Sequence, residues 1–300
     1  MVVTAHYNDG SSAAVSGYTY SPSGALAAGN NTITVSYSEG GVTKTDTQAI
    51  TVTTISNTLN SNSWATIKAV SDAGQGDNYW DVGDTKQITI NGKVGNTNIS
   101  NLAINVFIIG FNHNASREGS NRIHFKIGKI GNTQVGLCDS EYGNYTSTSG
   151  AFTMNTSNTN SGGWGSSQMR SKVLGSASSP TSPTANTLMA ALPSDLRAVM
   201  KSCTKYTDNK GGSNTASNVS STTDYLFLLS EYEVFATHQY CNDAEPNYQA
   251  QYDYFKAGNS KVANKHSATG TAAVWWLRSP YYIYINYYTY FCAVSSSGSL

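Results

Sequence analysis

The segment from residue 281 to residue 290 constrains the fold of this chain more than any other feature. Six of its ten residues are Tyr, and both odd and even positions carry aromatic or β-branched side chains. A half-buried strand would instead alternate between apolar and polar residues. Tyr offers a large amphipathic contact area at the cost of only two side-chain torsions, so binding surfaces use it often. We therefore expect a displayed recognition surface here.

The codons that this segment can use give a second constraint. Residues 281–300 contain no Lys, Glu, Gln, Met or Trp, the five amino acids that no codon ending in a pyrimidine encodes. Every residue from 281 to 297 belongs to the set reached when the two adenines of an Asn codon are replaced. Composition offers an alternative explanation for the missing Lys and Glu, because only 12% of the whole chain is charged.

Length and charge narrow the class of protein. Three hundred residues are enough for one large or two ordinary domains with a real core. Eighteen basic and 18 acidic residues give a net charge of zero, without a cluster of Lys or Arg. Nucleic-acid binding and anionic-membrane binding therefore lack their usual electrostatic basis. Abundant Gly, Ser, Thr and Asn indicate many loops, as in secreted or surface-displayed β-rich proteins.

The N-terminal residues and the lengths of the apolar stretches indicate where the protein acts. Residues 1–6 have neither the basic region nor the apolar run of a signal peptide. No stretch approaches the roughly 18 apolar residues of a membrane span, so we expect no direct membrane insertion. We expect an extracellular, cell-surface or virion protein whose natural N-terminal beginning is absent from this chain.

The four cysteines are far apart and form no Cys-x-x-Cys pair. They are Cys138, Cys203, Cys241 and Cys292. A structural zinc site needs closer pairs of ligands, and a disulfide framework is not implied for a chain of this size. We expect buried free thiols, because Cys packs readily as a small hydrophobic residue.

Periodicity divides the chain into two domains. Residues 1–54 contain alternating strands at 2–7, 32–37 and 48–53, separated by Gly-containing turns, which predicts a small all-β sandwich. Residues 55–63 are polar and are predicted to form a linker. Residues 64–300 are predicted to form the second domain.

The second domain mixes strands, helices and long loops. Strands are predicted at 88–90, 102–109 and 123–127, and loops over 140–185. Helices are predicted over 188–203, with Ser194 as a cap, over 230–235 after a capping box, and over 248–255. This order of elements predicts an α+β fold.

Several motifs of the second domain resemble one protein family. They are Trp80-Asp81-Val82-Gly83-Asp84-Thr85, Gly110-Phe111-Asn112-His113-Asn114, Arg122-Ile123-His124-Phe125, Phe152-Thr153-Met154-Asn155-Thr156, Leu226-Phe227-Leu228-Leu229-Ser230-Glu231 and Trp275-Trp276-Leu277-Arg278-Ser279-Pro280. Together they resemble gut-bacterial and phage proteins with a C-type-lectin-like fold, related to the formylglycine-generating-enzyme fold. Many members are variable proteins of diversity-generating retroelements, in which a reverse transcriptase randomises the adenines of a template. Residues 1–54 resemble bacterial immunoglobulin-like repeats. The first strand of such a repeat would precede residue 1, so we expect this domain to be partial.

The resemblance implies roles for the C-terminal residues. It places the variable ligand contacts on an exposed sheet and a fixed scaffold beneath them. The implied contacts are Tyr281, Tyr282, Ile283, Tyr284, Ile285, Asn286, Tyr287, Tyr288, Thr289, Tyr290, Ala293 and Ser295. The implied scaffold is Trp275, Trp276, Leu277 and Arg278, with Phe291, Cys292 and Val294. Family members continue past a Gly-Ser pair like Gly298-Ser299 for another strand or two, so we expect the lectin-like domain to be truncated at residue 300.

Three other motifs suggest competing chemistry. Glu245-Pro246-Asn247 matches a calcium- and mannose-binding tripeptide of C-type lectins, but it lacks the accompanying Trp-Asn-Asp run. Ser202 and Lys205 have a Ser-x-x-Lys spacing without the further motifs of penicillin-binding enzymes. His113 and His124 flank a polar turn with Arg117 and Glu118, yet a metal or acid–base role would need a third ligand or a nucleophile. We expect two satisfied structural histidines.

These observations predict a non-enzymatic ligand-binding protein without catalytic residues, metal or cofactor. Its partner would be a protein or glycan on a cell or phage-host surface, and not a nucleic acid. One alternative is a fixed surface adhesin or glycan-binding protein without programmed variation. Another is an oxidase or hydrolase on the related fold, in which mutation of His113 or Cys292 would abolish activity.

Overall fold

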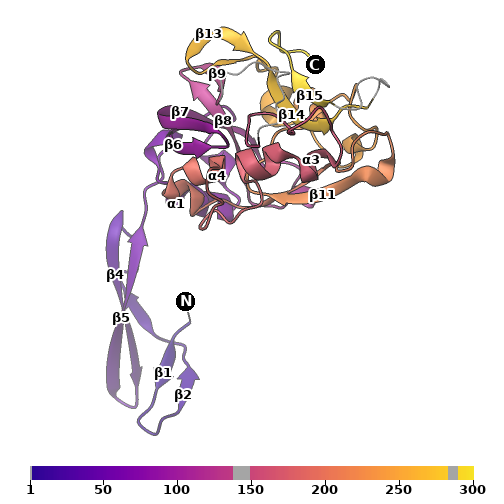
Figure 1. Cartoon of the computed structure of the whole chain (residues 1–300). Helices are drawn as coiled ribbons and strands as arrows, with labels where there is room; N and C mark the ends of the chain where they lie inside the picture. Colours follow the sequence, from indigo (N-terminus) through magenta and orange to yellow (C-terminus); the bar gives the residue numbers. More distant parts are fainter. Residues whose placement is uncertain (1, 138–148, 283–289) are drawn as a thin grey trace. The chain divides into compact units, whose positions relative to one another are not determined.

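The chain divides into two compact units, residues 1–55 and residues 56–300 (Figure 1). The computed structural model describes residues 2–137, 149–282 and 290–300.

The first unit consists of antiparallel strands alone. Strands β1 (Thr4–His6) and β2 (Ser12–Ala14) form a hairpin, while β3 (Thr19–Ser21), β4 (Gly29–Glu39) and β5 (Val42–Val52) form a three-stranded sheet. The predicted strands at 32–37 and 48–53 fall in β4 and β5, and the prediction at 2–7 overlaps β1. None of residues 2–55 is buried, so the unit has no closed hydrophobic core among its described residues.

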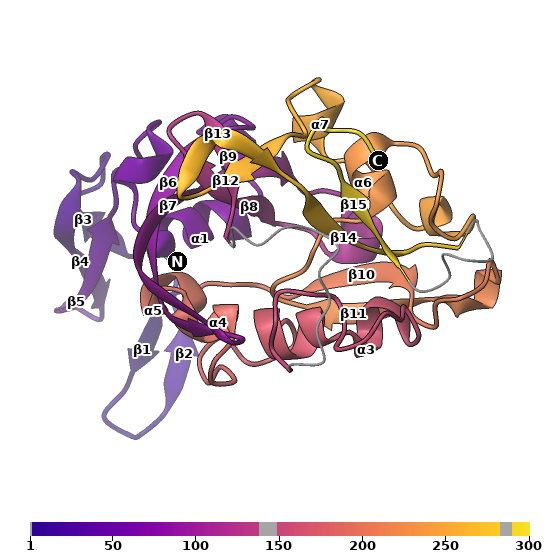
Figure 2. The same ribbon diagram turned by 45° about the horizontal axis from the view of Figure 1, so that its top comes forward.

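A six-stranded sheet organises the second unit, in the order β13-β12-β9-β8-β7-β6 (Figure 2). Its strands are β6 (Thr85–Val94), β7 (Thr97–Phe111), β8 (Ile123–Ile130), β9 (Thr133–Gly136), β12 (Ala263–Lys265) and β13 (Ala268–Ala273). Strand β7 lies between β6 and β8 and pairs antiparallel with both, which confirms the strands predicted from the sequence. Residues 106–110 of β7 are continuously buried, as the apolar run predicts.

The C-terminal residues pack against this sheet through one hydrophobic cluster. Phe107 and Ile109 of β7 contact buried residues from the last third of the chain. Those partners are Leu229, Val234, Tyr252, Tyr254, Phe255, Leu277, Cys292 and Val294. Leu277 belongs to β14 (Trp275–Pro280) and Val294 to β15 (Phe291–Val294), which pair antiparallel. The core therefore fixes the two strands that flank the Tyr-rich segment.

The remaining elements of the second unit are short. A two-stranded sheet of β10 (Cys203–Asp208) and β11 (Val219–Asp224) lies beside β14 (Figure 2). The short helices and helical turns are α2 (Ala115–Glu118), α3 (Gly163–Ser166), α6 (Glu231–Phe235), η1 (Leu59–Ser61), η2 (Gly76–Asn78), the π-helical turn η3 (Met169–Leu174), η4 (Ala216–Asn218) and η5 (Glu245–Asn247). Helices and mostly antiparallel sheets in one unit make the fold α+β.

Residues 56–63 belong to the second unit, although the sequence suggests a polar linker. Leu59 is buried, and the Asn62 carbonyl accepts a hydrogen bond from Lys86 Nζ at 2.6 Å. Helix α1 (Trp64–Asp72) follows directly, and its N-terminus is capped because Ser63 Oγ accepts a hydrogen bond from Thr66 N. Helix α1 is not among the elements predicted from the sequence. Its Trp64 packs edge-on against Phe125 of β8, at 5.6 Å between ring centroids.

The helix predicted over 188–203 is wrong. The structure has two single turns, α4 (Leu188–Ala191) and α5 (Ser194–Arg197), followed by strand β10. Leu192 is extended (φ −73°, ψ 151°) because the ring of Pro193 disfavours helical geometry in the preceding residue. Ser194 is the first residue of α5 and not its cap, since Pro193 occupies that position.

The helix predicted over 248–255 is also wrong, and only α7 (Asp253–Lys256) is helical. Side chains from another segment take the backbone carbonyls that such a helix would use: Asn114 Nδ2 donates to Tyr248 O, and His113 Nε2 contacts Ala250 O. The predicted capping box is confirmed. Ser230 Oγ accepts from Glu233 N, and the Glu233 carboxylate accepts from Ser230 N, at the start of α6.

Candidate ligand-binding site

The Tyr-rich segment connects β14 to β15. Tyr281, Tyr282 and Tyr290 are half-buried at its two ends. The predicted contacts Ile283, Tyr284, Ile285, Asn286, Tyr287, Tyr288 and Thr289 lie outside the described residues. The structure therefore shows how the segment is anchored.

A clamp joins the two ends of the segment. Tyr281 N donates to Tyr290 O at 2.9 Å. The buried amide of Asn160 donates from Nδ2 to Tyr281 O at 2.9 Å and to Tyr290 O at 3.0 Å. All the clamp atoms on Tyr281 and Tyr290 are backbone atoms. Their side chains are thus not needed for these hydrogen bonds.

A neighbouring loop adds two groups that the sequence analysis did not select. The ring of Tyr240 stacks on Tyr281 with centroids 4.5 Å apart, and Tyr240 O accepts from Tyr282 N at 2.9 Å. Asp243 Oδ1 accepts from the Tyr282 hydroxyl at 2.7 Å. Burial, together with this hydrogen bond, raises the pKa of Tyr282 to about 12. No periodic pattern marks Tyr240 or Asp243, because they reach the segment only through the tertiary fold.

Glu231 holds this loop in place from below. Its buried carboxylate accepts hydrogen bonds from the backbone N–H groups of Gln239, Tyr240 and Cys241. Cys292 Sγ of β15 lies 3.4 Å from the same carboxylate. One side chain therefore ties the loop that stacks on Tyr281 to the strand that follows the Tyr-rich segment.

The two remaining predicted contacts lie on and after β15. Ala293 is half-buried and pairs with Trp276 of β14. Ser295 is half-buried, and its N–H donates to Ser299 O at 2.7 Å. Both lie beyond the clamped segment rather than within it.

The predicted scaffold residues differ in burial. Arg278 is fully buried, with Nε donating to Thr207 Oγ1 at 2.7 Å and Nη1 to Leu228 O at 2.8 Å. Trp275 is half-buried and donates from Nε1 to Lys261 O at 2.9 Å. Trp276 is also half-buried. Of these three, Arg278 is the one wholly inside the protein.

Arg278 belongs to a buried ionic network. Glu233 accepts from Arg278 Nη2 and from Lys205 Nζ, each at 2.9 Å, and Lys205 Nζ also donates to Glu118 Oε2 at 2.7 Å. These four side chains are at most 3% exposed. The Tyr252 hydroxyl accepts a further hydrogen bond from Lys205. Two cations thus face two carboxylates beneath β14.

The charges in this network control one another's titration. Burial alone would raise the pKa of Glu118, but Lys205 and then His113 lower it to about 2. Burial likewise opposes ionisation of Glu233, yet Arg278 and Lys205 hold its pKa well below its usual value. Burial would lower the pKa of Lys205, whereas Glu233 and Glu118 raise it. Glu118, Glu233, Lys205 and Arg278 are therefore charged at neutral pH.

His113, Glu118 and His124 bring potential metal-ligand atoms within 4.8 Å of one another. Glu118 is therefore the third potential ligand beside the two histidines, which the spacing of His113 and His124 alone does not identify. His113 Nδ1 and Nε2 contact Glu118 Oε2 and Ala250 O, and His124 Nδ1 contacts the Tyr252 hydroxyl. Three of the four ring nitrogens of these histidines contact protein groups. The Lys205 ammonium lies 2.7 Å from Glu118 Oε2 and would repel a metal cation there, so this arrangement does not fit a metal ion.

The expectation of two satisfied histidines is confirmed for His113 and wrong for His124. His124 Nε2 is buried and has no hydrogen-bond partner in the part of the chain that the structure describes. Burial and then Lys205 lower the pKa of His124 to about 3, so its ring is neutral. The other hydrogen-bond partner of the Tyr252 hydroxyl is Lys205, which can only donate, so we assign the hydroxyl hydrogen to His124 Nδ1 and the ring proton to Nε2.

In the other two competing motifs, Ser202–Lys205 and Glu245-Pro246-Asn247, the key side chains Lys205 and Glu245 are buried and bonded within the protein. Lys205 is charged and paired with two carboxylates, so it cannot act as a base for Ser202. Glu245 is fully buried and accepts from Asp208 N, Ser279 Oγ and Gln249 Nε2. Burial raises the pKa of Glu245 to about 7. A carboxylate so enclosed offers no open face to calcium.

Three cysteines are buried free thiols, as predicted: Cys203, Cys241 and Cys292. Cys138 lies outside the described residues. Burial raises the pKa of Cys203 to about 12, and burial together with nearby carboxylates holds those of Cys241 and Cys292 well above the usual range. None of the three offers a reactive thiolate at neutral pH.

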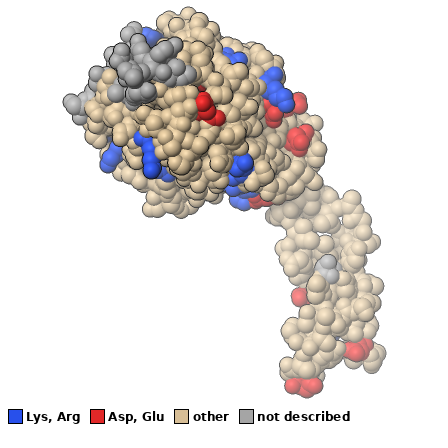
Figure 3. Space-filling model, turned by 90° about the vertical axis from the view of Figure 1, so that its right-hand side faces the viewer, with Lys and Arg blue, Asp and Glu red and all other residues tan. Residues whose placement is uncertain are grey.

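Charged side chains are sparse and scattered on the face drawn in Figure 3, without a basic patch. Among the residues that the structure describes, no helix has both the length and the apolar character needed to cross a membrane.

The site and the fold define an α+β domain that carries a clamped aromatic segment between two paired strands. A family model described as "Domain of unknown function (DUF6273)" matches residues 144–300, slightly more than half of the chain, and the chain belongs to this family. No curated protein and no solved structure matches it. The matched region contains every predicted contact and scaffold residue, the clamp residue Asn160 and the loop with Tyr240.

Proposed function

We propose that this protein is a non-enzymatic receptor whose residues 281–290, with Ala293 and Ser295, form a sequence-variable ligand-binding surface. The ligand would be a protein or glycan on a cell or phage-host surface, and the protein would act outside the cell or on a virion. In this proposal residues 56–300 form a C-type-lectin-like domain, preceded by an immunoglobulin-like unit. A retroelement would diversify the surface.

The clamp is the observation that carries this proposal. Backbone atoms of Tyr281, Tyr282 and Tyr290 hold the described ends of the segment to Asn160 and Tyr240, and the Tyr281 ring and Tyr282 hydroxyl add side-chain contacts. Backbone hydrogen bonds do not depend on which side chain the residue carries. A site of this kind tolerates substitution at the contact positions while its anchor stays unchanged, which is what a diversified surface requires.

The buried ionic network beneath β14 favours a rigid base for the proposed binding surface. Arg278, Glu233, Lys205 and Glu118 satisfy one another's charges away from solvent. Buried polar groups that are fully paired rigidify a core and favour one arrangement. A rigid support lowers the entropy that binding costs, and so favours affinity from a few aromatic anchors.

The same network argues against an enzyme. Among the described residues, the groups most suited to acid–base chemistry are buried and already paired within the protein: Glu118, Glu233, His113 and Lys205. A general acid or base must come within hydrogen-bond reach of a substrate. No substrate could reach these groups without breaking the core.

A binding screen with a triple variant tests the proposal. The full chain would be screened on arrays of glycans and of bacterial surface proteins, and each hit repeated with Tyr284→Ala/Tyr287→Ala/Tyr288→Ala. We expect binding to be lost while thermal stability stays nearly unchanged, because residues that serve ligand contact, as proposed here, contribute little to folding. A loss of several kcal/mol of stability, of the size that truncating buried side chains causes, would instead identify these residues as core.

Matched controls lie in the first unit. Tyr7 and Tyr20 are exposed, at 38% and 47%. Tyr7→Ala/Tyr20→Ala should leave binding intact. Equal loss of binding in the control and the triple variant would contradict the assignment of the site to residues 281–290.

A further inference from the structure

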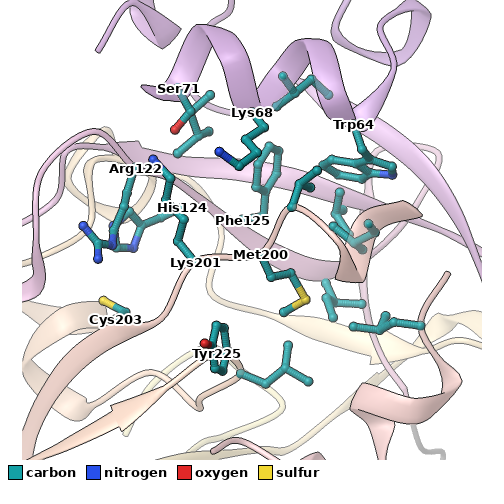
Figure 4. A pocket seen from close by; sticks show the side chains of 18 of the residues that line it. Trp64, Lys68, Ser71, Arg122, His124, Phe125, Met200, Lys201, Cys203 and Tyr225 are labelled. Atoms are coloured by element: carbon teal, nitrogen blue, oxygen red, sulfur yellow. The ribbon is translucent and has the colours of Figure 1, made fainter. Parts of the chain in front are cut away.

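A cavity lies between α1, β8 and the segment 192–203, and none of its lining residues belongs to the clamp that holds the Tyr-rich segment. Its volume is about 160 Å³. Figure 4 shows side chains from these elements converging on it, with Trp64 on one side and Arg122, His124 and Cys203 on the other. The cavity is therefore apolar at one end and polar at the other.

The apolar end suits a single ring. Trp64, Phe125 and Met200 line it, and Leu196 and Val199 are further apolar lining residues of the cavity. A cavity of about 150 Å³ lined by aliphatic and aromatic side chains is large enough to bind benzene. Aromatic rings and the Met thioether favour contact with another ring over a flexible alkyl chain.

The polar end carries positive charge. The lining residues include the cations Lys68, Arg122 and Lys201, and no Asp or Glu among those that the structure describes. Lys68 and Lys201 both pair with the one carboxylate of Asp72. The guanidinium of Arg122 donates to the neutral carbonyls of Ser120 and Ser202. Three cations face the carboxylate of Asp72, and Glu118, which lies near His124 and Cys203, is paired with Lys205, so positive charge is in excess beside the cavity.

His124 provides an independent observation at the same end. It lines the cavity, is 6% exposed, and its buried Nε2 lacks a hydrogen-bond partner in the described part of the chain. Buried polar groups in native proteins nearly always have partners. Its Nε2–H is a donor, as the partners of Nδ1 require, so the missing partner is an acceptor such as a ligand oxygen.

We propose that this cavity binds a small aromatic carboxylate, with its ring between Trp64, Phe125 and Met200 and its carboxylate toward Arg122, Lys201 and His124. The site shares no residue with the Tyr-rich surface. It gives the protein a small-molecule ligand that does not depend on the variable contacts.

Phenylacetate and its neutral counterpart phenylacetamide are suitable probes, used with the full chain in calorimetric titration or saturation-transfer NMR. We expect saturable binding of phenylacetate, and binding of phenylacetamide weaker by roughly tenfold, since charge-assisted hydrogen bonds are about twice as strong as neutral ones. Absence of saturable binding at millimolar concentrations would overturn the proposal. Equal affinity for the two probes would overturn the assignment of the ligand as an anion.

Two variants locate the site. Val199→Phe fills the cavity and should abolish binding of phenylacetate, whereas Val42→Phe, at a 57% exposed position of the first unit, should not. Lys201→Gln should weaken phenylacetate more than phenylacetamide, because it removes a charge and leaves the apolar end intact. If Val199→Phe does not fold, the Lys201→Gln comparison decides. Unchanged affinities in both variants would place any binding elsewhere.

Discussion

Removing the charge of Glu233 is the perturbation whose effect the structure defines best. Glu233→Gln keeps the size of the side chain and its ability to accept the capping hydrogen bond from Ser230 N. It leaves Lys205 and Arg278 buried with Glu118 as the one remaining carboxylate of the network. Removing one partner of a buried ion pair costs about 3–5 kcal/mol, because an uncompensated charge stays in the core.

This loss is large relative to the stability of a domain, which is about 5–15 kcal/mol in total. For a domain of this size, each kcal/mol lowers Tm by about 2–4 °C, so Glu233→Gln should lower it by about 6–20 °C. The five Trp residues all lie in the second unit, so Trp fluorescence during urea unfolding reports on that unit alone.

Asp195→Asn is the control for removing a carboxylate charge. Asp195 is exposed in the first turn of α5, and its replacement should cost less than about 1 kcal/mol. A loss in Glu233→Gln no greater than in this control would refute the view that the network is a structural support. It would mean that solvent or neighbouring groups compensate the two cations.

Three further predictions follow from the buried polar groups. Because the pKa of Glu245 is raised to about 7, the folded protein keeps a proton between pH 4.5 and 7 that the unfolded chain loses. The free energy of unfolding should therefore fall by up to about 3 kcal/mol as the pH rises through this range. Urea unfolding of Glu245→Gln should lack this decrease. The lowered pKa of His124 makes the free energy of unfolding rise with pH below pH 6.5, which is the opposite effect. His124 is present in both the unmodified protein and Glu245→Gln, so its contribution cancels when the two are compared. Asn160→Ala should cost about 1–3 kcal/mol in the same assay, because Tyr281 O and Tyr290 O each lose a hydrogen bond from the buried amide, while Tyr290 O keeps the one from Tyr281 N. A thiol reagent should modify at most one of the four cysteines before unfolding and all four afterwards, since Cys203, Cys241 and Cys292 are buried, and rapid native modification of two or more would contradict their burial.

Patterns of nearby residues correctly predicted the strands and the helix start that are determined by contacts along the chain. The continuous apolar run of β7 and the alternation of β8 identify the central strands, and Ser230 with Glu233 identifies the start of α6. The two predicted helices failed because the decisive interactions are not periodic. Pro193 interrupts one, and carbonyl contacts from His113 and Asn114 extend the chain in the other.

The candidate site shows the same division. The composition of residues 281–290 singles out the segment, but Asn160, Tyr240 and Asp243 contact it across separations of 39 to 130 residues in the sequence. Asn160 lies in a polar stretch that resembles any loop, and nothing in its neighbours marks its role. The network of Glu118, Lys205, Glu233 and Arg278 is similarly assembled from four separate segments.

Sequencing the DNA around this gene tests the central claim most directly. The proposal predicts a nearby near-copy of the codons for residues 275–300 that differs only where the copy has adenine, with a reverse-transcriptase gene beside it. The differences should fall on the codons of residues 281–290, 293 and 295, and leave Trp275, Trp276 and Arg278 unchanged. An intact locus without such a copy would contradict programmed variation, and would leave a fixed adhesin or glycan-binding protein as the account of the Tyr-rich surface.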